Sequence, residues 1–187
     1  MSALTIVVEG PFDAAVLRKL IPESLNSETR YFAAGGRSSL TTIGRNILVQ
    51  EGGPVLVVKD ADTTSPELAE ESRALTMAAL RSIAPHQPVG VFAFIPEIEI
   101  VFIEAAPVIK RLLNGASHMN EILERGRVTP KAVLAERASQ RARPDLTTWI
   151  EGLSRGDWEA IRAGAQASKF LAIVESLRNP AVAQTVA

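Results

Sequence analysis

Three acidic side chains come directly after apolar segments of this 187-residue sequence. Glu9 follows the apolar run 4–8, and Asp60 and Asp62 follow the run 54–58. Because side chains alternate along an extended chain, Asp60 and Asp62 can point to the same side. Carboxylates that gather repel one another unless a cation joins them, and Mg²⁺ prefers oxygen ligands. These residues therefore predict a metal site for Mg²⁺ or Mn²⁺.

Three further acids stand near the same points of the chain. Asp13 comes four residues after Glu9, where an acid is also common as a helix cap or a solvated loop residue. Glu97 and Glu99 follow the apolar run 89–95. Glu97 fits the start of a helix, whose positive end favours an acid, whereas Glu99 enters an otherwise apolar helix and needs a partner there. We expect Asp13 and Glu99 to complete the acidic site.

Alternating strands and helices must position these acids. The apolar or β-branched runs 4–8, 31–34, 54–58 and 89–95 predict four strands, and apolar residues return at helical spacing after each run. Strands that alternate with helices predict a mostly parallel, doubly wound α/β sheet. Ligands of such sheets bind outside the carboxyl ends of the strands, where the acids stand.

The helices of this first part show their apolar faces in the spacing of their residues. The helix that begins after Ser65 is expected to bury a stripe formed by Leu68, Leu75, Ala79 and Ile83. A further apolar helix is expected over 101–112. From about residue 114 onward no strand is indicated, and prolines separate three or four short helices. We therefore expect a catalytic domain over 1–113 and a helical extension over 114–187, with a loose tail from about 179.

Composition excludes several classes of site. The chain has no cysteine, so it has no disulfide, thiolate metal site or cysteine nucleophile, and its two histidines stand far from the acids. No apolar run is long enough to span a membrane, and the N-terminus lacks the features of a signal peptide. We expect a cytoplasmic protein that binds metal through oxygen and has no membrane partner.

Charge is distributed unevenly along the chain. Residues 1–109 have a net charge of −5 and residues 110–187 a net charge of +4. Such a split suits a basic half that meets an anionic partner, although a solvated helix surface explains it equally well. A basic stretch suited to the backbone of a nucleic acid comprises Arg125, Arg127, Lys131, Arg137, Arg141 and Arg143.

A glycine pair before the second helix offers another contact for phosphate. Gly35 and Gly36 allow the backbone to approach a phosphate group, and Arg37 next to them can bind it through two hydrogen bonds. A glycine pair is also common as a simple turn.

The order Glu9-Gly10-x-x-Asp13 followed by Asp60-x-Asp62 resembles the TOPRIM domain over about residues 1–113. The glycine-containing first motif and the segment 96–99 look most like the OLD (overcoming lysogenization defect) branch and its small stand-alone relatives. This resemblance implies a Rossmann-like TOPRIM fold and Mg²⁺-dependent chemistry on phosphodiester bonds.

The resemblance also implies roles for individual residues. Glu9 takes the place of the general acid or base, and Asp60 and Asp62 that of the metal-binding pair. OLD-type nucleases use a lysine of a late helix to stabilise charge on the phosphate, and Lys169 is similar to it; an exposed helix lysine is the alternative.

This sequence differs from several branches of the TOPRIM family, and the differences narrow the expected activity. The only tyrosine, Tyr31, falls in an expected buried strand, which argues against topoisomerase activity, and the zinc module of bacterial primases is missing. The Pro-Gly segment that follows the aspartate pair of ribosomal-RNA maturases is absent. Full-length OLD proteins contain an ATPase, whereas this sequence has no phosphate-binding loop, so an ATPase partner would be a separate chain.

We therefore expect a metal-dependent nuclease acting on DNA or RNA. Two alternatives remain open. A TOPRIM-like scaffold without catalysis would bind nucleic acid or protein within a larger complex. The segment 55–63 also looks like the nucleophile strand of haloacid-dehalogenase-type phosphatases, in which Asp60 would be phosphorylated and Asp62 would act as acid or base. That family usually places this strand first in the fold.

Overall fold

The computed structural model describes residues 3–112, 118–139 and 146–179. Within these residues the chain forms a four-stranded parallel sheet in the order β2-β1-β3-β4. This confirms the expected parallel α/β sheet. The strands are β1 (Leu4–Val8), β2 (Thr29–Ala33), β3 (Val55–Asp60) and β4 (Val89–Phe94).

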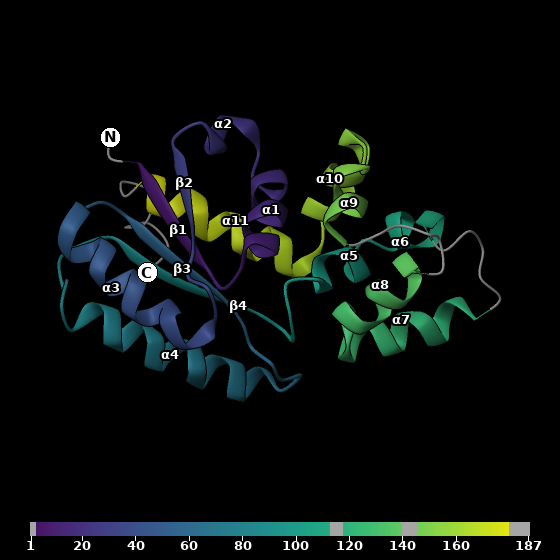
Figure 1. Cartoon of the computed structure of the whole chain (residues 1–187), viewed down its shortest axis with the longest axis horizontal. Coiled ribbons are helices and arrows are strands. Elements are labelled where there is room, and N and C mark those ends of the chain that lie inside the picture. The colour runs from purple at the N-terminus through teal and green to yellow at the C-terminus, as the bar shows by residue number, and fades with distance from the viewer. Residues whose placement is uncertain (1–2, 113–117, 140–145, 180–187) are drawn as a thin grey trace.

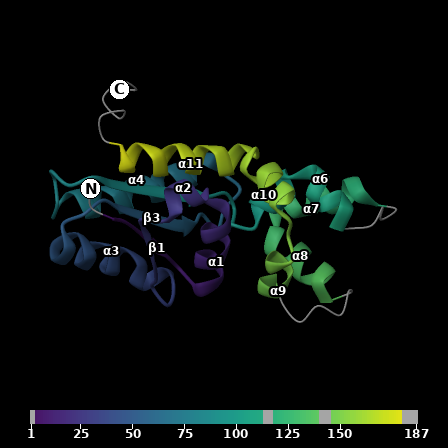
Figure 2. The same cartoon turned by 90° about the horizontal axis from the view of Figure 1, so that it is seen from above.

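Helices cover both faces of the sheet. One face packs against α1 (Pro11–Leu20) and α11 (Ala165–Arg178), and its apolar cluster includes Ile6 and Val58. The other face packs against α3 (Arg37–Glu51) and α4 (Pro66–Arg81), and its cluster includes Val7 and Val57. Figure 2 shows α11 and α3 on opposite sides of the strands. We call these the α1/α11 face and the α3/α4 face.

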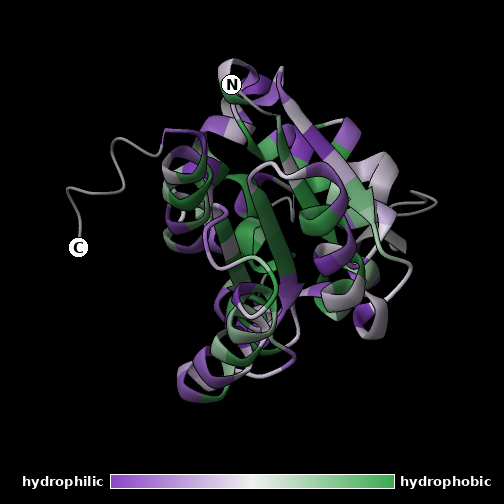
Figure 3. Ribbon diagram, turned by 90° about the vertical axis from the view of Figure 1, so that its left-hand side faces the viewer, coloured by the Kyte–Doolittle hydropathy of each residue, from purple (hydrophilic) through white to green (hydrophobic). Residues whose placement is uncertain are grey.

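The central strands are buried on both sides, as their uninterrupted apolar sequences predict. Side chains of β3 alternate between the two faces, and Val55 to Val58 are all nearly inaccessible to solvent. Figure 3 shows these strands as a hydrophobic centre inside helices of mixed hydropathy. Each carboxyl end is thereby held by packing on two faces, so residues that follow β1 and β3 have a rigid base.

The second strand differs from its expected environment. β2 lies at the edge of the sheet and is mostly exposed, with Phe32 48% accessible, so the expectation of a buried strand was wrong. Tyr31 is only half-buried, and its hydroxyl donates a hydrogen bond to Asn26 at 2.7 Å. A strand with one neighbour leaves part of its side chains to solvent, which its short sequence does not reveal.

The buried side of α4 also differs from the expected one. Leu68 and Leu75 are 56% and 67% exposed, and the residues that face the sheet are instead Ala69, Thr76 and Leu80. Ser65 caps the helix as expected, its hydroxyl accepting a hydrogen bond from the Leu68 N–H. Small side chains allow α4 to lie close to the sheet, so the stripe of large residues turns outward.

The remaining helices lie beyond the carboxyl end of the sheet, at the right of Figure 1. The helix expected over 101–112 is divided at Ala105 into two. Arg162 of α10 donates hydrogen bonds to the carbonyls of Lys19 and Leu20 at 2.8 Å, which ties this group to the end of α1. These helices are α5 (Ile100–Glu104), α6 (Ala106–Leu112), α7 (Met119–Val128), α8 (Pro130–Ser139), α9 (Leu146–Glu151) and α10 (Arg155–Arg162); the short α2 (Glu23–Asn26) precedes β2.

Two expectations concern residues outside the described ranges. The boundary between 113 and 114 and most of the tail from about 179 lie there, and the division into two domains stays a prediction. Among the described residues, no helix is both long and apolar enough to cross a membrane.

Candidate functional site

The carboxyl ends of β1 and β3 bring Glu9 and Asp60 together. The Asp60 N–H donates a hydrogen bond to Glu9 Oε1 at 3.2 Å, although the two residues are 51 positions apart. Asp60 Oδ1 accepts a second hydrogen bond, from the Ile98 N–H at 2.8 Å. The turn after β4 thus holds one oxygen of Asp60, and the end of β3 holds one oxygen of Glu9.

The acids divide between the two faces of the sheet edge. Val7 pairs with Val57 in the register of β1 and β3, so alternation places Glu9 on the α3/α4 face and Asp60 on the α1/α11 face. Asp13, from α1, belongs with Asp60. Its carboxylate accepts a hydrogen bond from the Gly10 N–H at 2.8 Å and closes the first turn of α1. The structure therefore assigns Asp13 a helix-capping role as well as a place beside the site.

The group on the α1/α11 face is Asp13, Asp60 and Glu99; Glu99 is buried, and the other two are partly buried. Burial, which is the largest cause, and the charges of Asp13, Glu99 and Glu9 together raise the pKa of Asp60 to about 8, against the hydrogen bond from Ile98. Burial also raises the pKa of Glu99 to about 7. Glu99 is 1% exposed, and its Oε2 has no hydrogen-bond partner among the described residues. A cation would relieve both the repulsion and the missing partner.

The group on the α3/α4 face is more open. Burial and the charges of Asp13 and Asp62 raise the pKa of Glu9, against the hydrogen bond from Asp60 and the charge of Arg37. Asp62 has a φ of 53°, an uncommon conformation for a non-glycine residue, and forms an ion pair with Arg37. Both members of the pair are about half exposed, so the pair adds little to stability.

The glycine turn lies beside this second group. Gly35 and Gly36 have φ angles of 76° and 134°, and no atom lies within 4 Å of where a Cβ would stand at either residue. The Gly36 N–H donates to the Glu9 carbonyl at 3.0 Å. The turn therefore needs glycine for its backbone, and it leaves open space next to Arg37, at the start of α3.

Two lysines also belong to the site. Lys131, in the first turn of α8, lowers the pKa of Asp13 and of Glu99 through its charge, in both cases less than burial raises them. The backbone N–H of Lys131 donates a hydrogen bond to Glu97 Oε2 at 3.2 Å, so Glu97 binds the first turn of α8. Lys59, which the sequence analysis did not single out, precedes Asp60 and is 8% exposed. The sequence feature that could have identified Lys59 is its charge, which directly follows the apolar residues of strand β3.

The rest of the basic stretch is largely engaged in ion pairs. Arg125 pairs with Glu136, and Arg127 pairs with Glu124 at 2.7 Å. Arg137 lies 3.8 Å from Glu136. Arg141 and Arg143 lie outside the described residues. Of this stretch, Lys131 is the residue that the structure brings to the acids.

Lys169 lies on α11 and is exposed, next to the buried Phe170. Helix α11 begins near the site, because the Gln166 side chain bonds both the N–H and the carbonyl of Ile95, at 2.7 and 2.6 Å. Within the described residues no hydrogen bond or ion pair joins Lys169 to an acid of the site. Its role therefore stays a prediction, and Gln166 is a contact of this region that the sequence did not reveal.

The acids do not form a ready-made cage for a metal. Among residues 3–112, 118–139 and 146–179, no group of three or more His, Asp or Glu side chains is arranged to hold an ion. The division between faces explains this, since Asp62 turns toward Arg37 and Asp60 binds a backbone N–H. The donor set is nevertheless all oxygen and mutually repulsive, with Glu99 fully buried, and it fits a hard divalent cation.

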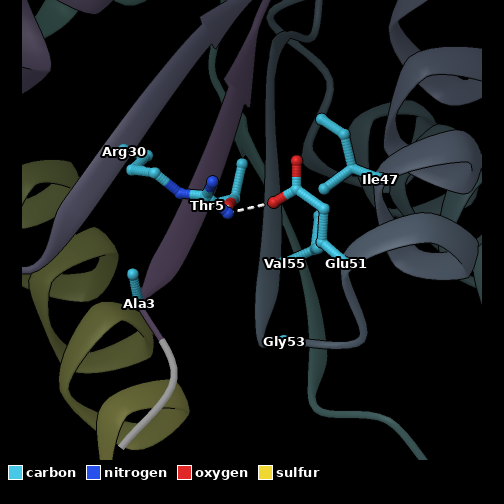
Figure 4. A pocket seen from close by; sticks show the side chains of 7 residues that line it. All are labelled: Ala3, Thr5, Arg30, Ile47, Glu51, Gly53 and Val55. Carbon is cyan, nitrogen blue, oxygen red and sulfur yellow. Dashed lines mark hydrogen bonds and ion pairs between the residues drawn. The ribbon is translucent and has the colours of Figure 1, made fainter.

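A cavity of about 320 Å³ lies at the opposite edge of the sheet (Figure 4). Its walls include Thr5 and Val55, at the amino ends of β1 and β3, and Arg30, whose guanidinium bonds Thr5 at 3.0 Å and pairs with Glu51. The charges in this cavity are matched, and it is remote from the acids at the carboxyl edge.

Comparison with known proteins gives a structural likeness. A scan of known families and a search of curated protein sequences both find no match. Among solved structures, the chain is similar to the C-terminal region of the Burkholderia pseudomallei OLD protein, with a TM-score of 0.56 and 15% identity, over 96% of this chain and 98% of that one. At this identity the likeness shows the fold alone. The chain thus has the α/β fold of the OLD C-terminal region, which contains the TOPRIM domain, and the resemblance expected from the sequence is confirmed for the fold.

Proposed function

We propose that this protein is a Mg²⁺-dependent nuclease that hydrolyses phosphodiester bonds of DNA or RNA. The observation that supports this most is the acidic edge itself, where burial and neighbouring acids raise the pKa of Asp60 to about 8. Such an arrangement is costly in the metal-free protein, because carboxylates are buried beside one another. Strongly perturbed acids at the ligand-binding edge of an α/β sheet are typical of a functional site.

The residues of the acidic edge have separate roles in the proposed reaction. Asp60, Asp62 and Glu9 would hold the cation, with Asp13 and Glu99 beside them. When bound, Mg²⁺ neutralises charge on the scissile phosphate and activates a water molecule. Glu9 would accept or donate a proton, a role supported by the hydrogen bond from the Asp60 N–H that holds one of its oxygens at 3.2 Å. Arg37 and the open turn at Gly35 and Gly36 would bind the phosphate backbone.

Binding requires a small rearrangement of side chains. Asp62 would leave the exposed ion pair with Arg37, which would free its carboxylate for the metal and the guanidinium for phosphate. Glu99 keeps its place, because its Oε2 is already buried without a partner among the described residues. Lys131, whose charge acts on Asp13 and Glu99, is a second candidate, besides Lys169, for the lysine that stabilises charge on the phosphate.

Asp60→Asn tests this proposal. Purified protein is incubated with single- and double-stranded DNA and RNA, in Mg²⁺, in Mn²⁺ and in a chelator. We expect metal-dependent cleavage that Asp60→Asn lowers at least about a hundredfold, as expected for loss of a metal ligand. Glu71→Gln, an exposed acid of α4, is the matched control and should retain wild-type activity.

Two results would contradict the proposal. Tight metal-independent binding of nucleic acid without any cleavage favours the scaffold without catalysis, which the absence of a preformed metal cage among the described residues supports. Hydrolysis of a small phosphate ester with phosphate trapped on Asp60 favours the phosphatase alternative. Against the latter, β3 is the third strand of this chain, whereas that family usually places it first.

A further inference from the structure

Lys59 is a buried lysine that the proposed reaction does not use. Its side chain is on β3 and only 8% exposed, and its Nζ donates a hydrogen bond to Ser72 Oγ of α4 at 2.8 Å. No carboxylate of the described residues lies within ion-pair distance of it. A buried ammonium with one neutral partner is costly, and a methionine of similar length would pack there more favourably.

The sheet places Lys59 near Glu9. Pairing between β1 and β3 ends at Val7 and Val57, whose side chains face α3 and α4, and alternation along β3 places Lys59 on the same face. Glu9 Oε1 accepts a hydrogen bond from the N–H of Asp60, the residue that follows Lys59. The positive charge of Lys59 therefore lies on the same face of the sheet as Glu9 and Asp62.

Among the described residues, the charges that act on Lys59 belong to the site. Burial lowers the pKa of Lys59 most, the charge of Arg37 lowers it further, and the charges of Glu9 and Asp62 raise it. Ser72 is neutral and holds the ammonium by the hydrogen bond to α4. This arrangement ties the cation to a helix and leaves its charge directed at two proposed metal ligands.

We propose that Lys59 is a positioning residue for Glu9, a fixed cation that balances Glu9 and Asp62 in the metal-free protein and keeps Glu9 oriented for proton transfer. This role rests on the proposed function. A fixed cation near the ligands also opposes a divalent ion, because like charges repel through the low-dielectric sheet edge. The protein therefore binds its metal more weakly than its carboxylates alone would allow.

The test measures Mn²⁺ binding by titration calorimetry, together with cleavage. In Lys59→Met, which removes the charge and keeps the length, we expect Mn²⁺ to bind at least about threefold more tightly. We expect kcat to fall about tenfold or more, with a smaller change in KM for nucleic acid. Lys59→Arg keeps the charge and should restore both values toward wild type. Ser72→Ala removes the anchor without changing charge and should leave the Mn²⁺ affinity unchanged.

The two proposals fail in different ways. If wild-type protein binds Mn²⁺ and Lys59→Met binds it equally or more weakly, Lys59 has no electrostatic role, and the inference is overturned while the nuclease proposal stands. The same holds if Lys59→Met only lowers the midpoint of thermal unfolding. If wild-type protein neither binds Mn²⁺ nor cleaves, the proposed function fails, and the inference fails with it.

Discussion

Asp60 shows how a single residue couples protonation, folding and metal binding. Its pKa is raised to about 8 by burial and by neighbouring acids, from an ordinary value of 3.8. A raised pKa means that the folded protein binds this proton more tightly than the unfolded chain. The resulting stabilisation is complete below about pH 4 and is lost as the pH rises toward 8.

We therefore predict that the metal-free protein becomes less stable between about pH 5 and 8, and that Asp60→Asn removes much of this decline. Thermal unfolding in a chelator at several pH values measures it. Glu71→Gln, exposed on α4, should reproduce the wild-type curve. A wild-type curve that rises over this interval, or a decline that Asp60→Asn leaves intact, would show that Asp60 is ionised at neutral pH.

Metal binding should release protons for the same reason. At pH 7 Asp60 is largely protonated and Glu99, with a pKa of about 7, is half protonated, so a cation must displace these protons. We predict that the Mn²⁺ affinity increases from pH 6 to 8. Titration calorimetry in buffers of different ionisation enthalpy gives the number of protons released. Heats that do not depend on the buffer would contradict this.

At the scale of elements, α11 packs closely on β4 near the amino end of this strand, at the opposite edge of the sheet from the site. A Cβ added at Gly90 would stand 2.9 Å from Leu177 and 3.1 Å from Leu56. We predict that Gly90→Ala destabilises the protein by about 1–3 kcal/mol, because the interface has no room. The free energy of unfolding in denaturant measures this change.

Gly156→Ala is the matched control for that substitution. Gly156 is an exposed residue of α10, and its added Cβ would meet only Ser154 Oγ at 3.9 Å. Replacing an exposed helical glycine by alanine is expected to stabilise by about 0.5–1 kcal/mol. If both substitutions shift stability in the same direction, α11 does not pack on β4 as closely as described.

The sequence predicted which strands and helices form better than it predicted how they pack against one another. The strands could be located because β1, β3 and β4 are uninterrupted apolar runs that end at turn residues or acids. The outward face of α4 could not be predicted, since Ala69 and Thr76 give a weaker periodic signal than Leu68 and Leu75. Which side of a helix is buried depends on how closely it can approach the sheet.

The same distinction applies to the candidate site. The acids could be found from sequence because they follow the strands, and the hydrogen bond between Asp60 and Glu9 shows that two of them meet. Their division between two faces depends on the register of β1 against β3, which no local pattern encodes. Alternation along β3 likewise places Lys59 on the α3/α4 face, where its Nζ reaches Ser72 of α4.

At the scale of the whole molecule, the acidic sheet and the basic helices meet at Lys131. Because Arg125 and Arg127 are held by glutamates, we predict that Lys131 contributes most among these three to nucleic-acid binding. Lys131→Met should weaken binding to a short oligonucleotide and reduce the slope of log affinity against log salt by about 1.

Arg155→Met provides the control, because it changes the net charge equally. Arg155 lies on α10, is 92% exposed and pairs with Glu159. Its replacement should leave the affinity nearly unchanged. Equal effects of the two substitutions would show that binding responds to net charge rather than to the cation beside the acids.

The packing of α11 has a consequence for how the protein is made. All four strands are complete by residue 94, yet α11, which packs Phe170 against Phe92 and Phe94 on one face of the sheet, follows more than seventy residues later. During synthesis this apolar surface leaves the ribosome long before its cover does. Part of the apolar sheet surface of the nascent chain is therefore exposed during this interval and can bind chaperones. The sheet reaches its final packing only after α11 has emerged.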